Sequence, residues 1–460
     1  MESVSFQPGF VNKLVKRHID VRSHTEEITT ELTIENSSQQ PMSSYLWAVS
    51  ADKAEHMSFF SAQTDKKEIK NQRVKLDGLE APKGVIFFRI AFPSSIAAGG
   101  SFRFSTLQVF THTLLPFPEE IAQEDSQFVK YFDNHFFFSP YHTAEVVTTV
   151  KLASERVESR STDEKPSNKR RDTLEYGPYS NIKPFSHSQL FVHYENNSPF
   201  VTFTKFTKNI EVSHWGNVAV EERYYLRHTG ARLRGSFSRH DYQQRHFASK
   251  ASFRTITAIL PKYTTAVYYR DQIGNISTSH LRHAYDHQVL EVDPRFPMFG
   301  GWGADFQIAY GLPALRVISV DKSHPNVHVL NVTFSTSFAH SVVDKAMVRV
   351  VLPEGSSDIK YVMPFAIDED GFDKRFTYLD TVGRPVLVLK SKNLNRLHNQ
   401  YFQVRCSHNR LVSVRLSSLP LSLVLVLFFC YACMFGSIAA LTVLRPSSCV
   451  RVCVVRMCVR

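Results

Sequence analysis

The chain has 460 residues, of which 43% are hydrophobic and 21% charged, which is enough for two or three domains and excludes a largely disordered protein. Its net charge of +11 suggests a nucleic-acid-binding protein, but eleven of the 54 Lys and Arg residues follow Asp380, the last acidic residue. Residues 1–380 therefore carry 43 basic and 43 acidic side chains, and this balance argues against nucleic-acid binding by the folded part.

Alternation of apolar and polar residues recurs along most of the chain and predicts β-strands with one buried face. In residues 28–34 the apolar side chains share one face, and residues 347–352 have a similar pattern. In residues 327–334 the alternation places Asn331 on the polar face. The 36 Phe and 18 Tyr residues also favour strands over helices.

These patterns predict a mainly β protein with two tandem β-sandwich-like domains, residues 1–208 and residues 209–405. Residues 154–172 are rich in both charges and are predicted to be an exposed loop of the first domain. Residues 119–132 have the nearest approach to a helical pattern and are predicted to form a short helix. The first 405 residues contain no Cys, so no disulfide framework is expected there.

A long apolar segment near the end of the chain predicts a membrane anchor. Residues 419–444 contain no charged residue before Arg445, and at ~1.5 Å per residue a helix of this length crosses a ~30 Å hydrocarbon core. A membrane-proximal linker (residues 406–418) precedes this predicted transmembrane helix, and a short basic, Cys-rich tail (residues 445–460) follows it. Basic residues flank both sides in similar numbers and do not set its orientation. The first ten residues, as written, predict no signal peptide.

Four asparagines stand in the N-x-S/T pattern that accepts N-linked glycans: Asn275, Asn331, Asn36 and Asn196. Asn275 lies in a turn-like segment, whereas Pro199 directly follows the Asn196 pattern and disfavours its use. Each pattern is a weak signal because it is short. Together they favour a chain whose bulk lies in the lumen of the secretory pathway.

Candidate catalytic and metal-binding patterns are weak. The common metalloprotease, nucleophile-elbow and phosphate-loop motifs do not occur. His283 and His287 have the ligand spacing of a helix, but a polar surface segment is the simpler interpretation. Residues 368–373 resemble the start of a calcium loop without its closing Glu, and residues 299–303 (Phe-Gly-Gly-Trp-Gly) are interpreted as a tight turn packed by aromatic rings. We therefore predict no catalytic, cofactor-binding or metal-binding residues.

Longer segments of the chain are similar to a known family, and these matches are ordered and non-repetitive. They are His193-Tyr-Glu-Asn-Asn-Ser-Pro-Phe200, Ile210-Glu-Val-Ser-His-Trp-Gly-Asn217, Val220-Glu-Glu222, His228-Thr-Gly-Ala231, Phe237-Ser-Arg-His-Asp-Tyr242, Tyr268-Tyr-Arg-Asp271, Ile273-Gly-Asn-Ile-Ser-Thr-Ser-His280, Pro294-Arg-Phe-Pro297, Phe299-Gly-Gly-Trp302, Leu352-Pro-Glu-Gly355 and Tyr378-Leu-Asp-Thr-Val-Gly-Arg-Pro385. On these residues the chain resembles the ribophorin I family over roughly residues 10–405. The similarity stops at both ends, before residue 8 and after about residue 403.

The resemblance implies a single-pass type I membrane protein of the endoplasmic reticulum with its bulk in the lumen. It implies a non-catalytic subunit of the oligosaccharyltransferase complex, which transfers an oligosaccharide from dolichyl pyrophosphate to Asn in sequons of nascent polypeptides. The partners implied are the other subunits, including the catalytic multi-pass one, the nascent chains and the membrane, with the translocon and ribosome as further candidates. By the same resemblance, Asn275 matches the family's glycan acceptor position.

Two other functions are alternatives to this one. A single-pass β-sandwich receptor or adhesion protein of the secretory pathway would have the same strands and anchor. A luminal metallopeptidase would need a zinc motif that the sequence does not contain. Isolation of a stable multi-subunit membrane complex would favour the subunit over the receptor.

Overall fold

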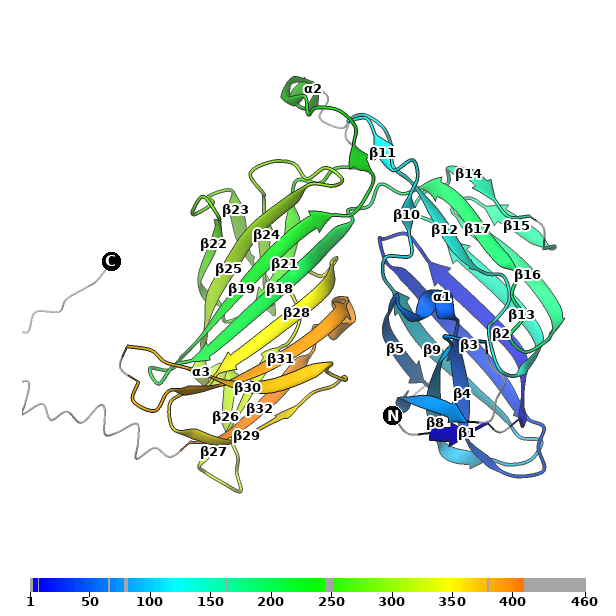
Figure 1. Cartoon of the computed structure of the whole chain (residues 1–460), viewed down its shortest axis with the longest axis horizontal. Coiled ribbons are helices and arrows are strands. Elements are labelled where there is room, and N and C mark those ends of the chain that lie inside the picture. Colours follow the sequence, from blue (N-terminus) through cyan, green and yellow to red (C-terminus); the bar gives the residue numbers. More distant parts are fainter. Residues whose placement is uncertain are drawn as a thin grey trace, which may run out of the picture. The chain divides into compact units, whose positions relative to one another are not determined.

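The computed structural model describes residues 3–6, 8–64, 67–77, 82–162, 164–244, 251–378 and 380–408 (Figure 1). Strands hold 59% of these described residues and helices 4%, which confirms the predicted mainly β class. The chain up to Ser407 forms one compact unit. The predicted transmembrane helix, the tail and most of the predicted linker lie outside the described residues.

Two separate clusters of buried apolar side chains form the interior of this unit. One cluster extends from Phe10 to Phe200 and the other from Val201 to Cys406. We call the parts that contain them the N-terminal half (residues 3–200) and the C-terminal half (residues 201–408). The predicted boundary after residue 208 falls inside a strand that begins at Val201, and the division into two domains stays a prediction.

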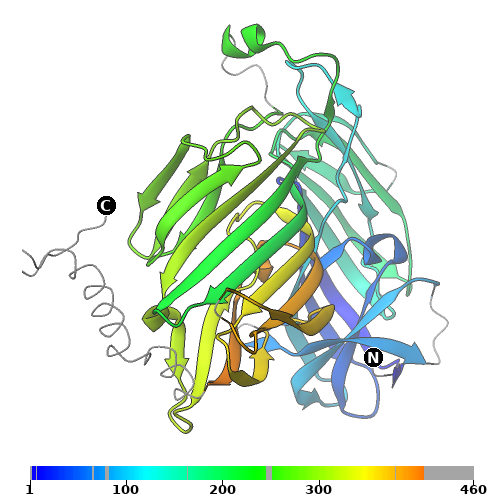
Figure 2. The same cartoon turned by 60° about the vertical axis from the view of Figure 1, so that its left-hand side comes forward.

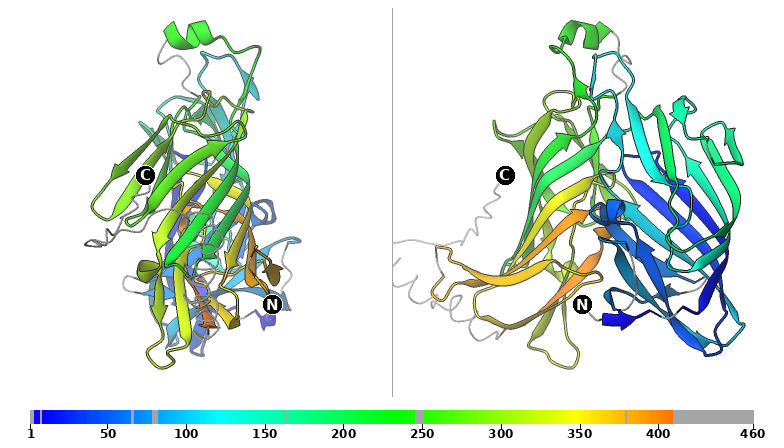
Figure 3. Two further views of the ribbon diagram at one scale, coloured as in Figure 1. Left: turned by 90° about the vertical axis from the view of Figure 1, so that its left-hand side faces the viewer. Right: turned by 45° about the vertical axis from the view of Figure 1, so that its right-hand side comes forward.

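The N-terminal half is built around a mixed eight-stranded sheet, shown in blue to green in the right panel of Figure 3. Its order is β15 (Ser167–Arg170), β16 (Thr173–Ile182), β13 (His142–Lys151), β2 (Phe10–Asp20), β3 (Glu26–Asn36), β9 (Ser101–Phe110), β5 (Met57–Gln63) and β6 (Glu68–Ile69). Two four-stranded sheets accompany it: β1 (Ser3–Ser5), β7 (Asn71–Asp77), β8 (Ile86–Ile96) and β4 (Met42–Val49); and β10 (Leu115–Pro116), β12 (Phe128–Asn134), β17 (Gln189–Glu195) and β14 (Val157–Arg160). The short helix α1 spans Ala51–Ala54.

The C-terminal half is built around a seven-stranded sheet, which Figure 2 shows in green, yellow and orange. Its order is β22 (Thr265–Asp271), β25 (Gly303–Pro313), β19 (Asn217–His228), β18 (Val201–Val212), β28 (Val342–Val351), β31 (Arg384–Leu394) and β30 (Glu369–Arg375). Smaller sheets are β21 (Ile256–Pro261), β24 (His287–Val292) and β23 (Ser279–His283); and β26 (Ile318–Val320), β27 (Val327–Thr333), β32 (Tyr401–His408) and β29 (Ser356–Val362). The remaining elements are α2 (Arg239–Gln244), α3 (Ala314–Val317), a 3-10 turn (Arg396–His398), and the pair β11 (Glu120–Ile121) and β20 (Arg232–Leu233).

Period-two alternation explains the long strands. In β3 every second residue from Glu26 to Asn36 is buried, and the residues between them are partly exposed. The strands predicted around residues 28–34, 327–334 and 347–352 are confirmed as parts of β3, β27 and β28. Each fully buried aliphatic or aromatic side chain on such a face stabilises the fold by about 1.5–3 kcal/mol relative to exposure.

Two predictions about local structure were wrong. Residues 119–132 form β11 and the start of β12 rather than a helix, because Val129 and Tyr131 are buried on one face of a strand that pairs with β17. The charged segment 154–172 contains β14 and β15. Both are edge strands, where pairing through the backbone needs no apolar side chain. In addition, β32 continues to His408, past the predicted end of the second domain at residue 405.

Candidate functional site

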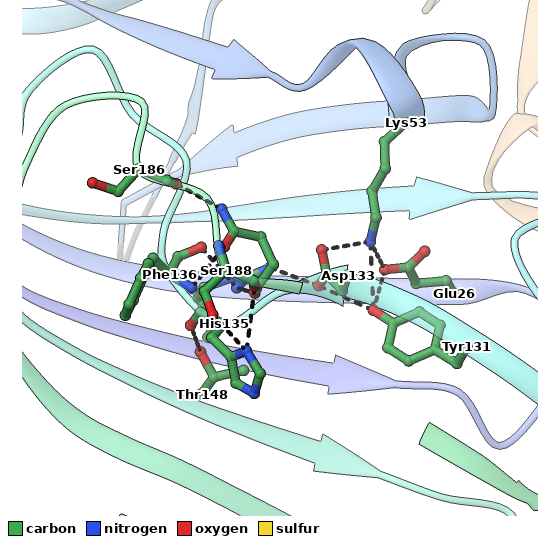
Figure 4. Close-up of polar contacts among 11 residues, drawn as sticks. Glu26, Lys53, Tyr131, Asp133, His135, Phe136, Thr148, Ser186 and Ser188 are labelled. Atoms are coloured by element: carbon green, nitrogen blue, oxygen red, sulfur yellow. Dashed lines mark hydrogen bonds and ion pairs between the residues drawn. The ribbon is translucent and has the colours of Figure 1, made fainter. Parts of the chain in front are cut away.

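A buried ionic cluster joins four elements of the N-terminal half, and Figure 4 shows its contacts among Glu26, Lys53, Tyr131 and Asp133. Lys53 of α1 contacts the carboxylate of Glu26 on β3, and its Nζ lies 2.9 Å from Asp133 Oδ1 on β12. The Tyr131 hydroxyl donates to Glu26, and Arg17 lies 2.8 Å from Asp133 Oδ2. The carboxylates of Glu26 and Asp133 are 0% and 5% exposed, so two cations and two carboxylates are removed from water together.

The two carboxyl groups of this cluster have pKa values that are shifted in opposite directions. Burial raises the pKa of Glu26, and the nearby charge of Asp133 acts in the same direction, although Lys53 opposes both. Burial would also raise the pKa of Asp133, but Lys53 and Arg17 hold it well below its usual range. The pKa of Glu26 is therefore raised and the pKa of Asp133 is lowered. The contacts of Glu26 and Asp133 with Lys53, Arg17 and Tyr131 are internal, and they tie α1 to the sheets.

His135 lies beside this cluster and has a different set of partners. Its Nδ1 lies 3.3 Å from the Ser188 carbonyl oxygen, and the Thr148 hydroxyl donates to the His135 carbonyl. The neighbouring Asn134 amide donates to the Ser186 carbonyl and accepts from the backbone N–H of Ser188. Figure 4 shows these contacts on the side of Asp133 away from Lys53. They bind the end of β12 to the segment before β17.

The C-terminal half buries a second ionic cluster. Lys208 on β18 and Glu222 on β19 are cross-strand partners, with Nζ and Oε1 2.9 Å apart and side chains only 1% and 0% exposed. The hydroxyls of Tyr224 and Tyr310 donate to Glu222. Burial and the Glu222 charge raise the pKa of both tyrosines well above its usual range, so they remain protonated donors. Lys208 also donates to the Thr333 hydroxyl, at 3.0 Å.

Neither cluster was among the predicted site residues, although charged residues on the apolar faces of strands could have indicated them. In β18, Lys208 alternates with buried Phe206 and Ile210, and in β19 Glu222 occupies the inward position between Val220 and Tyr224. A charge on the apolar face of a strand requires a buried partner. The alternation of inward and outward positions therefore predicts an internal ion pair. Which residue is the partner depends on the register between strands.

Two of the four predicted glycan acceptors are buried. The Asn36 amide donates to the carbonyls of Gln40, Ile96 and Ala97, and its oxygen accepts from Ser38. The Asn196 amide donates to Val21 and Ser23, and its oxygen accepts from Ser198. Both side chains are 0% exposed. A glycan needs the amide nitrogen free, so in the folded protein these two sites are disfavoured.

The other two acceptors are exposed. Asn275 lies in the turn after β22, where its side-chain oxygen accepts from Arg270. Asn331 lies on β27 between buried Leu330 and Val332, so its side chain projects from the outer face as the alternation predicts. The structure therefore favours Asn275 and Asn331 over Asn36 and Asn196, and which acceptors are used stays a prediction.

The weak motifs are placed in ordinary structure. β23 ends at His283 and β24 begins at His287, so this pair closes a hairpin rather than lying on a helix. Residues 368–373 lead into and form most of β30. Among the residues that the structure describes, no group of three or more His, Cys, Asp or Glu side chains is arranged to hold a metal ion.

The segment at residues 299–303 is a tight turn, as predicted. A side chain at Gly300 would place its Cβ 1.7 Å from the Ala231 carbonyl oxygen, so only glycine permits this approach of two backbones. The rings of Phe299 and Trp302 lie 5.3 Å apart, and Phe237 packs against both. The turn therefore fixes the backbone beside β20.

A cavity of about 480 Å³ is lined by residues of both halves, including Asp20, His24, His340 and Arg396. Burial lowers the pKa of His24 to about 3, so its imidazole is neutral at pH 7. The lining carries acidic and basic groups in a mixture. It therefore does not select a ligand by charge.

No helix among residues 3–408 that the structure describes is long and apolar enough to span a bilayer.

Comparison with known proteins identifies relatives over most of the chain. A family model described as Ribophorin I matches residues 10–436. Dolichyl-diphosphooligosaccharide–protein glycosyltransferase subunit 1B of Arabidopsis thaliana is 39% identical over 396 residues, covering 85% of this chain and 84% of that protein. The subunit 1B of Oryza sativa is 38% identical over 430 residues, covering 91% and 89%. Subunit 1 of Caenorhabditis elegans is 38% identical over 392 residues, covering 85% and 66%.

Solved structures offer a weaker likeness. An M1 zinc metallopeptidase from Deinococcus radiodurans aligns with a TM-score of 0.26 and 8% identity, covering 46% of this chain and 42% of that one. A TM-score this low supports no functional comparison.

Proposed function

The chain belongs to the ribophorin I family, and we propose that it acts as a non-catalytic subunit of the oligosaccharyltransferase complex of the endoplasmic reticulum. This complex transfers a preassembled oligosaccharide from dolichyl pyrophosphate to Asn in the sequons of nascent polypeptides. The observation that carries the proposal is the 39% identity to a subunit 1B over 396 residues, which spans both halves of the β structure.

The proposed role is to scaffold partner subunits and to handle substrate. The charged groups of the interior support this role, because Glu26, Asp133 and Glu222 are engaged by internal donors rather than aimed into a cleft. Transfer of an oligosaccharide from a pyrophosphate needs a cation near the leaving group and carboxylates near the acceptor amide. In this proposal the catalytic multi-pass subunit supplies these groups.

The proposed location is the lumen, with residues 419–444 as the membrane anchor. The apolar sequence of that segment supports the anchor. The exposure of Asn275 and Asn331 supports a luminal β structure, because a luminal acceptor must present its amide to solvent. Other subunits, nascent polypeptides and the membrane are the proposed partners, with the translocon and ribosome as further candidates.

Isolation of the tagged full chain from mildly solubilised endoplasmic reticulum membranes tests this function. We expect the other subunits to co-isolate in fixed ratio, and the isolate to glycosylate an acceptor peptide when a lipid-linked donor is added. The purified chain alone is expected to transfer nothing. Isolation of the chain without these subunits would contradict the proposal and favour a receptor, and transfer by the chain alone would contradict its accessory role.

A further inference from the structure

Large apolar side chains are exposed together at one end of the seven-stranded sheet. Trp215 in the β18–β19 hairpin is 93% exposed, and Leu315 in α3 is 95% exposed. The β30–β31 loop adds Tyr378, which is 98% exposed, together with Phe376 and Val382. We call these five residues the aromatic end. Soluble surfaces seldom gather such side chains without a use for them.

Strand register places these loops at the same end of the sheet. Asn217 at the start of β19 is the partner of Pro313 at the end of β25, directly before α3. The backbone N–H of Ala314 donates to the Gly216 carbonyl, which joins α3 to the hairpin tip. On the other side, β18 and β28 end together, and Val351 of β28 pairs with Val386 at the start of β31.

The described chain also ends here. β32 lies beside β29, which begins at Ser356. Just before it, Glu354 accepts from the backbone N–H groups of Val382 and Gly383 in the β30–β31 loop. Figure 1 shows α3 and this loop at the lower left of the C-terminal half, where β32 also finishes. Only residues 409–418 separate this point from the apolar run, a span of at most about 35 Å when fully extended.

The charges around the aromatic end are largely neutralised by one another. Arg384 lies 2.7 Å from Glu211 and 3.2 Å from Asp380, and Arg375 lies 3.1 Å from Glu211. The surface therefore offers exposed aromatic and aliphatic groups with little net charge. Trp and Tyr side chains prefer the boundary between lipid headgroups and acyl chains, where the ring is half desolvated and its polar atom stays hydrated.

We propose that the aromatic end rests on the bilayer surface, with Trp215, Leu315 and Tyr378 inserted into the headgroup layer. This inference rests on the membrane anchorage proposed above and adds the orientation of the sheet. A bilayer fits better than a protein partner because the residues come from separate loops beside the point where the chain leaves toward its apolar segment. Since the local charges cancel, the contact needs no anionic lipid.

The opposite end of the sheet provides a built-in control. Ile273, 81% exposed in the turn after β22, lies at that end, because Asp271 pairs with Phe306 near the start of β25. β25 has 11 residues, so at ~3.3 Å per residue the two ends are roughly 30 Å apart. Asn275 lies in the same distant turn. In this orientation a glycan on Asn275 points away from the membrane.

Tryptophan fluorescence of the full chain in phosphatidylcholine vesicles tests the proposal. The chain has three Trp residues, and Trp47 is buried. Vesicles of brominated phosphatidylcholine should quench about a third of the emission of the natural chain, since Trp215 is one of three tryptophans. Trp215→Phe should lose this quenching. A matched variant, Trp215→Phe with Ile273→Trp, should restore the emission but not the quenching.

Flotation with the same vesicles separates the anchor from the aromatic end. A chain that floats and shows the expected quenching supports the proposal. A chain that floats without quenching of Trp215, or with equal quenching of the Ile273→Trp control, overturns the proposal and leaves the anchor intact. A chain that does not float overturns both. Leu315→Glu with Tyr378→Glu should reduce Trp215 quenching severalfold without reducing flotation, and loss of a co-isolating subunit instead would assign the surface to a protein partner.

Discussion

The two halves of the molecule bury the same kind of charged side chains but enclose them differently. In the N-terminal half, Lys53 is 12% exposed and contacts both Glu26 and Asp133, and it shares Asp133 with Arg17. In the C-terminal half, Lys208 and Glu222 are almost completely buried, and their other contacts are neutral groups. The first cluster can exchange partners when one charge is lost, whereas the second cannot. The same residue types should therefore differ in their contribution to stability.

The sequons repeat this contrast. Asn36 and Asn196 of the N-terminal half are internal hydrogen-bonding residues, whereas Asn275 and Asn331 of the C-terminal half are exposed. One short pattern thus serves the interior in one half and is available to modification in the other. Burial, not the pattern, decides which use is possible.

The largest effect on stability is expected for the buried Lys208–Glu222 ion pair of the C-terminal half. Glu222→Gln keeps the shape of the side chain but leaves Lys208 charged and without a counterion, so the free energy of unfolding should fall by about 3–5 kcal/mol. Denaturant unfolding of the full chain measures this change. Adding Lys208→Met should recover part of the loss. If Glu222→Gln were as stable as the natural chain, Lys208 would not depend on Glu222 as its buried counterion.

The next effect concerns a buried sequon. Asn196→Asp replaces an amide that donates to two carbonyls by a carboxylate that faces them, which should lower the free energy of unfolding by about 2–4 kcal/mol. The same change at exposed Asn275 should stay within about 0.5 kcal/mol of the natural chain. Thermal melts of the two variants side by side make the comparison. Equal effects would remove the distinction between buried and exposed sequons.

A smaller effect is expected for the open cluster of the N-terminal half. Lys53→Met leaves Arg17 to neutralise Asp133, and the raised pKa of Glu26 allows that carboxyl to take up a proton. The free energy of unfolding should therefore fall by about 1–3 kcal/mol, less than for Glu222→Gln. Chemical denaturation of both variants under one condition gives the ranking. A larger loss for Lys53→Met would reverse the comparison of the halves.

The smallest effect, counted per pH unit, concerns the pH dependence of the free energy of unfolding and comes from one buried histidine. His228 donates from Nε2 to Ala251 and accepts at Nδ1 from the Gly230 N–H, and burial lowers its pKa to about 4. A folded pKa below the unfolded value of about 6.5 means that the stabilisation is present above pH 6.5 and is lost as pH falls toward 4. His228→Gln should therefore reduce the slope of the unfolding free energy in that window by about 1.4 kcal/mol per pH unit. An unchanged slope would exclude His228 as a contributor.

Much of the fold could be predicted because the alternation of buried and exposed residues in a strand is visible in a short stretch of sequence. Alternation identified the strands that contain Ile28 and Leu330, and it correctly placed Asn331 on an outer face. The same rule, continued for one more step, places Asn36 on the buried face of Ile34 and Asn196 on that of Tyr194. These two sequons could therefore have been assigned to the interior from the sequence.

The rest depends on long-range pairing that local patterns do not encode. Lys53 meets Glu26 and Asp133 through three elements that are distant in the chain. The strand β15 forms from a charged segment because β16 offers it a free edge. The aromatic end combines loops more than 160 residues apart, since Trp215 and Tyr378 are brought to one end of the sheet only by the register of β18, β28 and β31.

The luminal location of the C-terminal half is the central claim, and removal of N-linked glycans tests it most directly. The full chain expressed in a eukaryotic cell should shift to lower mass with endoglycosidase H. We expect Asn275→Gln to reduce the shift, and Asn275→Gln with Asn331→Gln to abolish it, because these are the sequons with exposed amides. A natural chain without any shift would contradict a luminal location. A shift that survives the double variant would show that Asn36 or Asn196 is modified, against their burial in the folded protein.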